Sequence, residues 1–236
     1  MNFQIAPNVN IGILFVFAVG SLAVYGVILA GWASNNKYAF IGSLRSSAQL
    51  ISYEIPLGLS ILGMVLIAGT LDLNQIVNWQ NRIVWGVVVQ PIGFLLFLVS
   101  AFAETNRLPF DLPESEQELV GGFHTEYSGM KFGMFFLGEY LHVITVSYLT
   151  VILFFGGWAL PFVLDPSQTS FWSAVLKVLV LLVKVALMIL FIMWVRWTLP
   201  RFRYDQLMDL AWKSLIPLAL VNVVATAAVV ELLYSI

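Results

Sequence analysis

Residues 11–32 read IGILFVFAVGSLAVYGVILAGW and contain no charged side chain. A helix needs about 20 apolar residues to cross the roughly 30 Å hydrocarbon layer of a membrane, so this stretch predicts a transmembrane helix. The stretch lies close to Met1, but it lacks the basic start and the small-residue cleavage site of a secretory signal. We therefore interpret it as a span that the protein retains.

The composition of the whole chain agrees with a membrane protein. Of the 236 residues, 60% are hydrophobic and 10% are charged, whereas a soluble domain has about 25% charged residues. The net charge of −2 does not favour nucleic-acid binding. The sequence has no cysteine, which excludes disulfides and iron–sulfur ligation by this chain. His124 and His142 are too few for a metal site, so any redox centre is a diffusible ligand or belongs to a partner.

Five further segments are also long and apolar enough to span. Backbone groups in lipid must be paired within their own segment, which favours helices, and the alternation typical of a β-barrel is absent. The predicted fold class is an all-α integral membrane bundle of about six transmembrane helices, forming one domain over residues 1–236 with a cytoplasmic loop at 104–128. After the span at 11–32, the predicted spans cover 47–70, 83–103, 132–155, 171–195 and 215–233.

The distribution of lysine and arginine predicts the orientation. One side of the membrane receives most of the basic residues, and the other receives Arg82, with Lys177 near its edge. The positive-inside rule places the basic side in the cytoplasm, so both ends of the chain and the loops 71–82 and 158–170 face outward. The basic residues of the cytoplasmic side are Lys37, Arg45, Arg107, Lys131, Arg196, Arg201, Arg203 and Lys213.

Several charges fall inside the predicted spans, where each costs about 2.5–3.5 kcal/mol at the centre of the membrane. At about 1.5 Å per residue, Glu54 and Glu139 lie roughly 13 and 12 Å from the cytoplasmic edge, and Lys184 lies roughly 18 Å deep. Glu104 ends the third span at the inner edge. An entrance at Glu104, an intermediate layer and a central lysine are typical of a proton relay.

Structural interpretations of the same charges are also open. Glu139 and His142 are spaced i, i+3 and could satisfy each other. Glu54 and Lys184 could form a structural ion pair. Lys177 lies near the outer edge, where its amine can reach water, so we assign it no function.

Between the third and fourth spans lies an acidic loop that holds six of the 13 acidic residues, with Arg107 as the only base among them. Ser115 and Glu118 have the spacing of a capping box, which predicts a short helix that Gly121 and Gly122 end. A solvated acidic loop is the ordinary alternative. We expect the loop to fold back onto the bundle or against a partner, because its acids alternate with Leu108, Phe110, Leu112, Leu119, Val120 and Phe123.

Four stretches carry a resemblance to a known family. They are AETNRLPFDLPE at 103–114, EQELVGGFHTEYSGMKF at 116–132, LPRFRYDQLM at 199–208 and SYEIP at 52–56. In these stretches, and over nearly its whole length, the chain resembles the quinone-site membrane subunit of respiratory NADH:quinone oxidoreductase (complex I). The stretch FLGEY at 136–140 is more similar to the respiratory bacterial version than to the plastid version.

The resemblance implies an eight-helix subunit at the junction of the hydrophilic and membrane arms, in the bacterial plasma (inner) membrane. Family members carry a longer N-terminal region with two further spans, so the six spans here match the last six. The implied substrate is quinone, with no covalently bound cofactor, and NADH, FMN and iron–sulfur clusters would reside only in partner subunits. The implied partners are the other membrane subunits and the quinone-site and iron–sulfur subunits of the peripheral arm.

The resemblance also assigns roles to individual residues, none of them catalytic or metal-binding. Arg107 and Glu126 would order the loop beside the quinone chamber. Phe132, Phe135 and Phe136 would lie near the lipid-side entrance for quinone, although aromatic residues in a membrane helix are more often ordinary packing. The implied proton path contains Glu54, Glu104, Glu139, Asp111, Glu114, Glu116 and Glu118, to which the depth argument adds Lys184.

Three other functions remain as alternatives. The membrane subunit of an energy-converting hydrogenase or formate hydrogenlyase would share the carboxylates without using quinone. A free-standing proton-coupled transporter would need a substrate site at a broken helix and usually inverted repeats, neither of which the sequence indicates. A purely structural anchor would not need graded buried acids.

Overall fold

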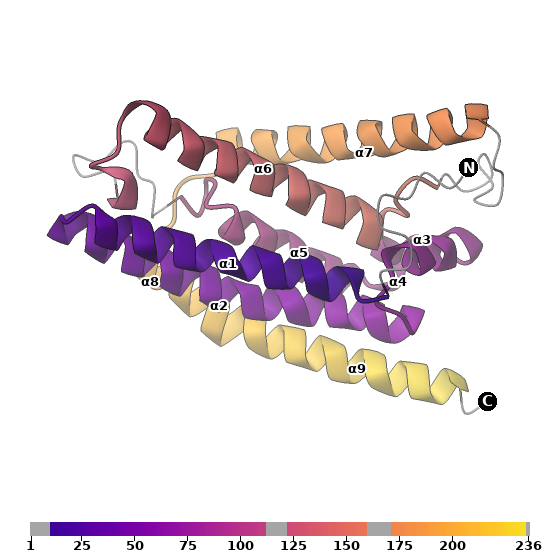
Figure 1. Cartoon of the computed structure of the whole chain (residues 1–236). Helices are drawn as coiled ribbons and strands as arrows, with labels where there is room; N and C mark the ends of the chain where they lie inside the picture. Colours follow the sequence, from indigo (N-terminus) through magenta and orange to yellow (C-terminus); the bar gives the residue numbers. More distant parts are fainter. Residues whose placement is uncertain (1–9, 112–121, 160–170, 235–236) are drawn as a thin grey trace.

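The computed structural model describes residues 10–111, 122–159 and 171–234, and the regular structure within these ranges is helical. The long helices run roughly along one common axis (Figure 1). Five are long and apolar enough to cross a membrane, which confirms the predicted all-α membrane bundle. In chain order the elements are α1 (Gly12–Ala33), α2 (Lys37–Ala68), α3 (Leu73–Arg82), α4 (Gly86–Val89), α5 (Pro91–Glu104), the 3₁₀ turn η1 (Gly122–His124), α6 (Gly129–Phe154), α7 (Phe171–Thr198), α8 (Tyr204–Asp209), the π-helical segment η2 (Leu210–Leu215) and α9 (Ile216–Tyr234).

A tight turn joins α1 to α2. Asn35 has a φ of 51°, a left-handed conformation that asparagine tolerates better than most residues. The side chain of Asn36 then caps α2 by accepting a hydrogen bond from the Tyr38 amide at 2.9 Å. This cap starts α2 at Lys37 rather than at the predicted residue 47, so the segment 37–46, which carries Lys37 and Arg45, is helical as well.

The predicted third span at 83–103 is divided into two helices. The four-residue α4 ends at Val89, Gln90 is not helical (φ −129°, ψ 64°), and α5 begins at Pro91. Proline has no amide hydrogen to donate, and it disfavours the helical conformation in the residue before it. The 14 residues of α5 are therefore a short apolar helix rather than a full span by themselves. The predicted outer loop at 71–82 also contains a helix, α3, which Asp72 caps.

The last span begins earlier than the predicted residue 215. The segments α8, η2 and α9 form one helical stretch that starts at Tyr204. Two hydrogen bonds attach its first part to α2. The Tyr53 hydroxyl donates to the Leu207 carbonyl at 2.8 Å, and the Trp212 indole donates to the Ser52 hydroxyl at 3.2 Å.

The helix α2 lies at the centre of the bundle and packs against α1, α5 and α9. Its Tyr53 and Met64 are completely buried, as is Phe97 of α5, which packs against Phe154 of α6. By contrast, α1 and α7 bury only a few side chains each and leave apolar surface exposed, as expected for helices that face lipid.

The beginning of α1 and the end of α9 lie at the same end of the bundle (Figure 1). This arrangement requires an even number of crossings if the axis of the bundle is perpendicular to the membrane. The division into six spans and the orientation with both ends outward stay predictions.

Candidate functional site

A cavity of about 560 Å³ lies between α1, α2, α5 and α6. Its walls are mostly apolar, and its titratable side chains come from three different helices. These side chains are Glu54 on α2, Glu104 at the end of α5, and Glu139 and His142 on α6. The structure thus brings Glu54, Glu104 and Glu139, the three carboxylates that the depth argument singled out, to one cavity.

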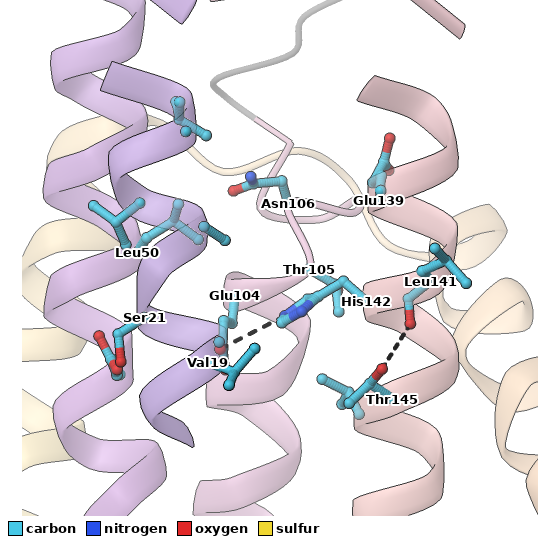
Figure 2. Close-up of a pocket in the computed structure, with 18 of the residues that line it drawn as sticks. Val19, Ser21, Leu50, Glu104, Thr105, Asn106, Glu139, Leu141, His142 and Thr145 are labelled. Atoms are coloured by element: carbon cyan, nitrogen blue, oxygen red, sulfur yellow. Dashed lines mark hydrogen bonds and ion pairs between the residues drawn. The ribbon is translucent and has the colours of Figure 1, made fainter. Parts of the chain in front are cut away.

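Glu104 faces His142 across the cavity (Figure 2). The Glu104 Oε1 and His142 Nε2 atoms are 3.6 Å apart, and the two side chains are 15% and 26% exposed. That distance is longer than a direct hydrogen bond. The structure therefore pairs His142 with a carboxyl group of another helix, in place of the pairing with Glu139 that their spacing along α6 allowed.

Glu139 forms a buried ion pair with Arg107 from the loop after α5. The Arg107 Nε and Glu139 Oε1 atoms are 2.5 Å apart, and both side chains are less than 10% exposed. The Arg107 guanidinium also lies 4.5 Å from the centre of the Tyr140 ring. This pair connects the loop to α6 at the carboxylate cavity.

The start of the acidic loop is folded onto the bundle. Arg107 and Phe110 are buried, and the Gln49 amide of α2 donates hydrogen bonds to the Ala103 and Phe110 carbonyls at 2.9 and 3.0 Å. The ring of Phe110 stacks on Phe202, 5.6 Å away between centres. The expectation that the loop packs on the bundle is therefore met for residues 105–111, while its predicted short helix at 115–122 lies almost entirely outside the described residues.

Of the remaining predicted residues of the acidic loop, Asp111 and Glu126 are not among those that line the cavity. Asp111 lines a separate small pocket with Arg107, Phe136, Glu139 and Arg196. Glu126 accepts a hydrogen bond from the Asn36 side chain at 2.6 Å, which ties the end of the loop to the turn between α1 and α2. Glu114, Glu116 and Glu118 lie outside the described residues.

The predicted quinone-entrance aromatics form a cluster at the beginning of α6. Phe135 lines the carboxylate cavity and contacts Phe123 and Tyr127, with ring centres 5.5 and 5.1 Å apart. The rings of Phe132 and Phe136 are 4.7 Å apart. Packing within the cluster accounts for these contacts, so they do not by themselves assign a quinone site.

The structure places Lys184 away from the carboxylates. It is not among the residues that line the cavity. The Lys184 amine instead donates to three carbonyl oxygens beyond the end of α6, so the possible ion pair with Glu54 is wrong. It also lies 5.3 Å from the Trp85 ring centre, where a cation is attracted to the ring face. The carbonyls belong to Phe155 at 2.8 Å, Gly157 at 2.9 Å and Ala159 at 2.8 Å.

These contacts explain why depth alone misplaced Lys184. The residue is near the middle of α7, as residue counting predicted, but α6 ends beside it. Carbonyls at the end of a helix lack partners in their own helix and attract cations. Lys184 therefore caps the C-terminal end of the neighbouring helix α6.

Sequence reasoning did not include His142 among the site residues. The available signal was its position inside a span and its i, i+3 spacing from Glu139, which places both residues on one side of α6. What the sequence did not indicate was that this side faces Glu104.

The fold and the site together define a class of protein. The chain is a membrane protein with an ionisable site inside its helical bundle, and a buried ion pair ties a loop to that site. Comparison with known proteins identifies the family. The sequence pattern of the family described as NADH dehydrogenase matches residues 1–227. The chain belongs to this family, and it is a multi-pass membrane protein.

Curated relatives agree with this assignment. The chain is 53% identical over 224 residues to the H subunit of NADH-quinone oxidoreductase from Protochlamydia amoebophila, covering 95% of this chain and 65% of the relative. It is 48% identical over 225 residues to an H subunit of NADH-quinone oxidoreductase from Cytophaga hutchinsonii, covering 95% and 66%. For NADH-quinone oxidoreductase subunit 8 of Rhodothermus marinus, the identity is 49% over 238 residues, covering 97% and 70%. The chain thus spans about two thirds of the length of these relatives.

Proposed function

We propose that this chain is a membrane subunit of a proton-translocating NADH:quinone oxidoreductase in the bacterial plasma (inner) membrane. In this role it contributes to the quinone chamber and to the carboxylate entry of the proton path. The names of the relatives, each a subunit of an NADH-quinone oxidoreductase, support the assignment. They also favour the quinone enzyme over a component of a hydrogenase or a free-standing transporter.

The observation that carries the proposal is the convergence of Glu54, Glu104 and Glu139 from three helices on one cavity. Carboxyl groups inside a membrane domain are costly and normally face a water-filled path or a partner. The apolar walls keep the surroundings of low polarity, where one charge strongly influences the protonation of another. Such a cluster is suited to taking up and releasing protons when a nearby charge changes.

The loop after α5 provides the connection to quinone chemistry in this proposal. Arg107 joins this loop to Glu139. A change of charge beside the loop on quinone reduction would act on this pair first. Two charges 4 Å apart interact by about 4 kcal/mol at an effective dielectric constant of about 20. An effect of that size is enough to reset the proton occupancy of a neighbouring carboxylate.

The chain supplies no electron carrier in this proposal, because its sequence has no cysteine to ligate an iron–sulfur cluster. Electrons would reach quinone from an iron–sulfur subunit of the peripheral arm, and NADH and FMN would bind in other partner subunits. The residues proposed beside quinone are Arg107, Glu126, Phe132, Phe135 and Phe136.

Purification of the native assembly through a tag on this chain tests the proposal. We expect flavin and iron–sulfur subunits to copurify, with NADH:quinone reductase activity that changes the pH inside proteoliposomes. Copurification of a nickel–iron subunit without quinone reductase activity would indicate the hydrogenase alternative. Recovery of the chain without redox subunits would contradict membership in either enzyme.

A further inference from the structure

His142 is a titratable residue of the cavity to which neither the family resemblance nor the proposed path assigns a role. Its Nε2 atom is buried, lies 3.6 Å from Glu104 Oε1 and has no hydrogen-bond partner among the described residues. The imidazole points toward Glu104 in Figure 2. A buried ring nitrogen aimed at a carboxyl group from another helix calls for a functional explanation.

The surroundings of His142 contain charged groups from several elements. Glu104 comes from α5, Glu54 from α2 and Glu139 from the same helix as His142. Arg107 from the loop is engaged with Glu139. The helix α1 contributes apolar residues and the Ser21 hydroxyl, but no charged side chain, to the cavity wall. Of these groups, Glu104 is the one whose carboxyl oxygen lies within 4 Å of His142 Nε2.

We propose that His142 transfers protons between the Glu104 carboxyl group and water in the cavity, an inference that rests on the proposed function. In the forward step the O–H bond of Glu104 breaks and an N–H bond forms at His142 Nε2, which leaves a carboxylate and an imidazolium. The imidazolium then releases the proton on Nδ1 to a water molecule, giving hydronium and neutral imidazole. The ring can then return to its first tautomer through rotation or water exchange.

Imidazole is suited to this step because one ring nitrogen accepts a proton while the other donates one. The 3.6 Å separation requires the two side chains to approach each other, or a water molecule to bridge them. Both side chains line the cavity, whose volume of about 560 Å³ is large enough to hold water. His142 thus gives Glu104 a way to exchange protons while Glu139 is held by Arg107.

Two substitutions separate proton transfer from a structural role. His142→Asn keeps a polar side chain of similar reach but cannot be protonated at neutral pH. His142→Ala leaves space for added imidazole. In the purified assembly, both variants should lower proton translocation per electron at least tenfold, because a positioned proton-transfer group typically contributes about 10²-fold or more. Added imidazole should restore translocation in His142→Ala and have no effect on His142→Asn.

Ser147→Ala is the matched control, further along α6 and not among the residues that line the cavity. The Ser147 hydroxyl donates to the Val143 carbonyl of its own helix at 2.8 Å and takes no part in the proposed transfer. This variant should translocate protons as the unmodified assembly does, with or without imidazole. Normal translocation in His142→Asn would overturn the inference, and so would a loss in His142→Ala that imidazole fails to restore.

An infrared titration keeps this test separate from the test of the proposed function. The carboxyl band of Glu104 is assigned by its disappearance in Glu104→Gln, and its pH titration needs no turnover. If the unmodified assembly translocates no protons, the proposed function fails, but the titration still reports on His142. A displaced Glu104 titration in His142→Asn would support proton exchange between the two groups, and an unchanged titration would overturn it.

Discussion

At the scale of single residues, Glu139 of the Arg107–Glu139 pair has both a proposed functional role and a structural role. Glu139 belongs to the proposed proton path, and it also compensates the charge of a buried arginine. Removing one partner of a buried ion pair leaves the other charge unpaired and costs about 3–5 kcal/mol. A loss of activity in a single Glu139 variant therefore combines a stability effect with any effect on proton transfer.

A double-substitution cycle separates the two effects. We expect Glu139→Gln and Arg107→Gln each to reduce the yield and thermal stability of the assembly, and the double variant to be more stable than the sum of the two losses predicts. Thermal unfolding of the purified assembly measures this. Glu126→Gln is the control, because Glu126 is exposed and its partner Asn36 is neutral. Strictly additive losses would show that the pair is not energetically coupled.

At the scale of helices, the close packing of α4 on α6 fixes the position of the first part of the divided third span. A Cβ atom on Gly86 would lie 2.5 Å from the Leu153 carbonyl oxygen and 2.9 Å from the Met64 side chain. Gln80 of α3 reinforces the junction, since its side-chain oxygen accepts hydrogen bonds from the Gly86 and Gly156 amides at 3.0 Å each. Backbone cannot move aside as a flexible side chain can, so this position requires glycine.

Gly86→Ala should therefore destabilise the protein, by about 1–3 kcal/mol as for other overpacked cores. Gly58→Ala is the matched control, because a Cβ atom there meets nothing within 4 Å and alanine favours the helix by up to about 1 kcal/mol. Thermal unfolding in detergent, followed by circular dichroism, compares the two variants. Equal stability of Gly86→Ala and the unmodified chain would mean that α4 and α6 are not packed as closely as the structure shows.

Local sequence signals account for most of the helices but not for their contacts. Runs of apolar residues located the long helices, but the division of the third span at Pro91 was not predicted. The early start of α2 depends on the Asn36 cap, a local signal that the hydrophobic pattern alone does not contain. Lys184 shows what the sequence alone does not predict. Its depth followed from counting residues, but its carbonyl partners depend on where α6 ends in space.

The sequence likewise predicted residues of the candidate site but not their contacts. Charge inside a span identified Glu54 and Glu139, and charge at the inner end of a span identified Glu104, because an ionisable residue in or beside lipid is informative by itself. The pairing of Glu139 with Arg107 and the approach of His142 to Glu104 are contacts between separate segments. No spacing along one helix could indicate them, since they depend on the rotation of α6 relative to α5.

At the scale of the whole molecule, the common end of α1 and α9 supports an even number of crossings (Figure 1). The absence of cysteine from the sequence makes the topology directly testable with single cysteine substitutions. We expect Gln75→Cys on α3 to react with an impermeant maleimide added from outside, and Asp205→Cys on α8 to react only after the membrane is opened. Both positions are exposed, so burial does not protect them. The reverse labelling pattern would invert the orientation.

The central claim is that the carboxylate cavity carries protons, and Glu54 tests it most directly. Glu54 lines the cavity, and a glutamine in its place keeps the shape of the side chain but cannot exchange protons at neutral pH. The measurement is proton translocation per electron by the Glu54→Gln assembly in proteoliposomes, normalised to the amount of assembled enzyme. We predict normal assembly with at least a tenfold loss of proton translocation, in line with the loss of a proton-transfer group. Translocation equal to that of the unmodified assembly would contradict the account.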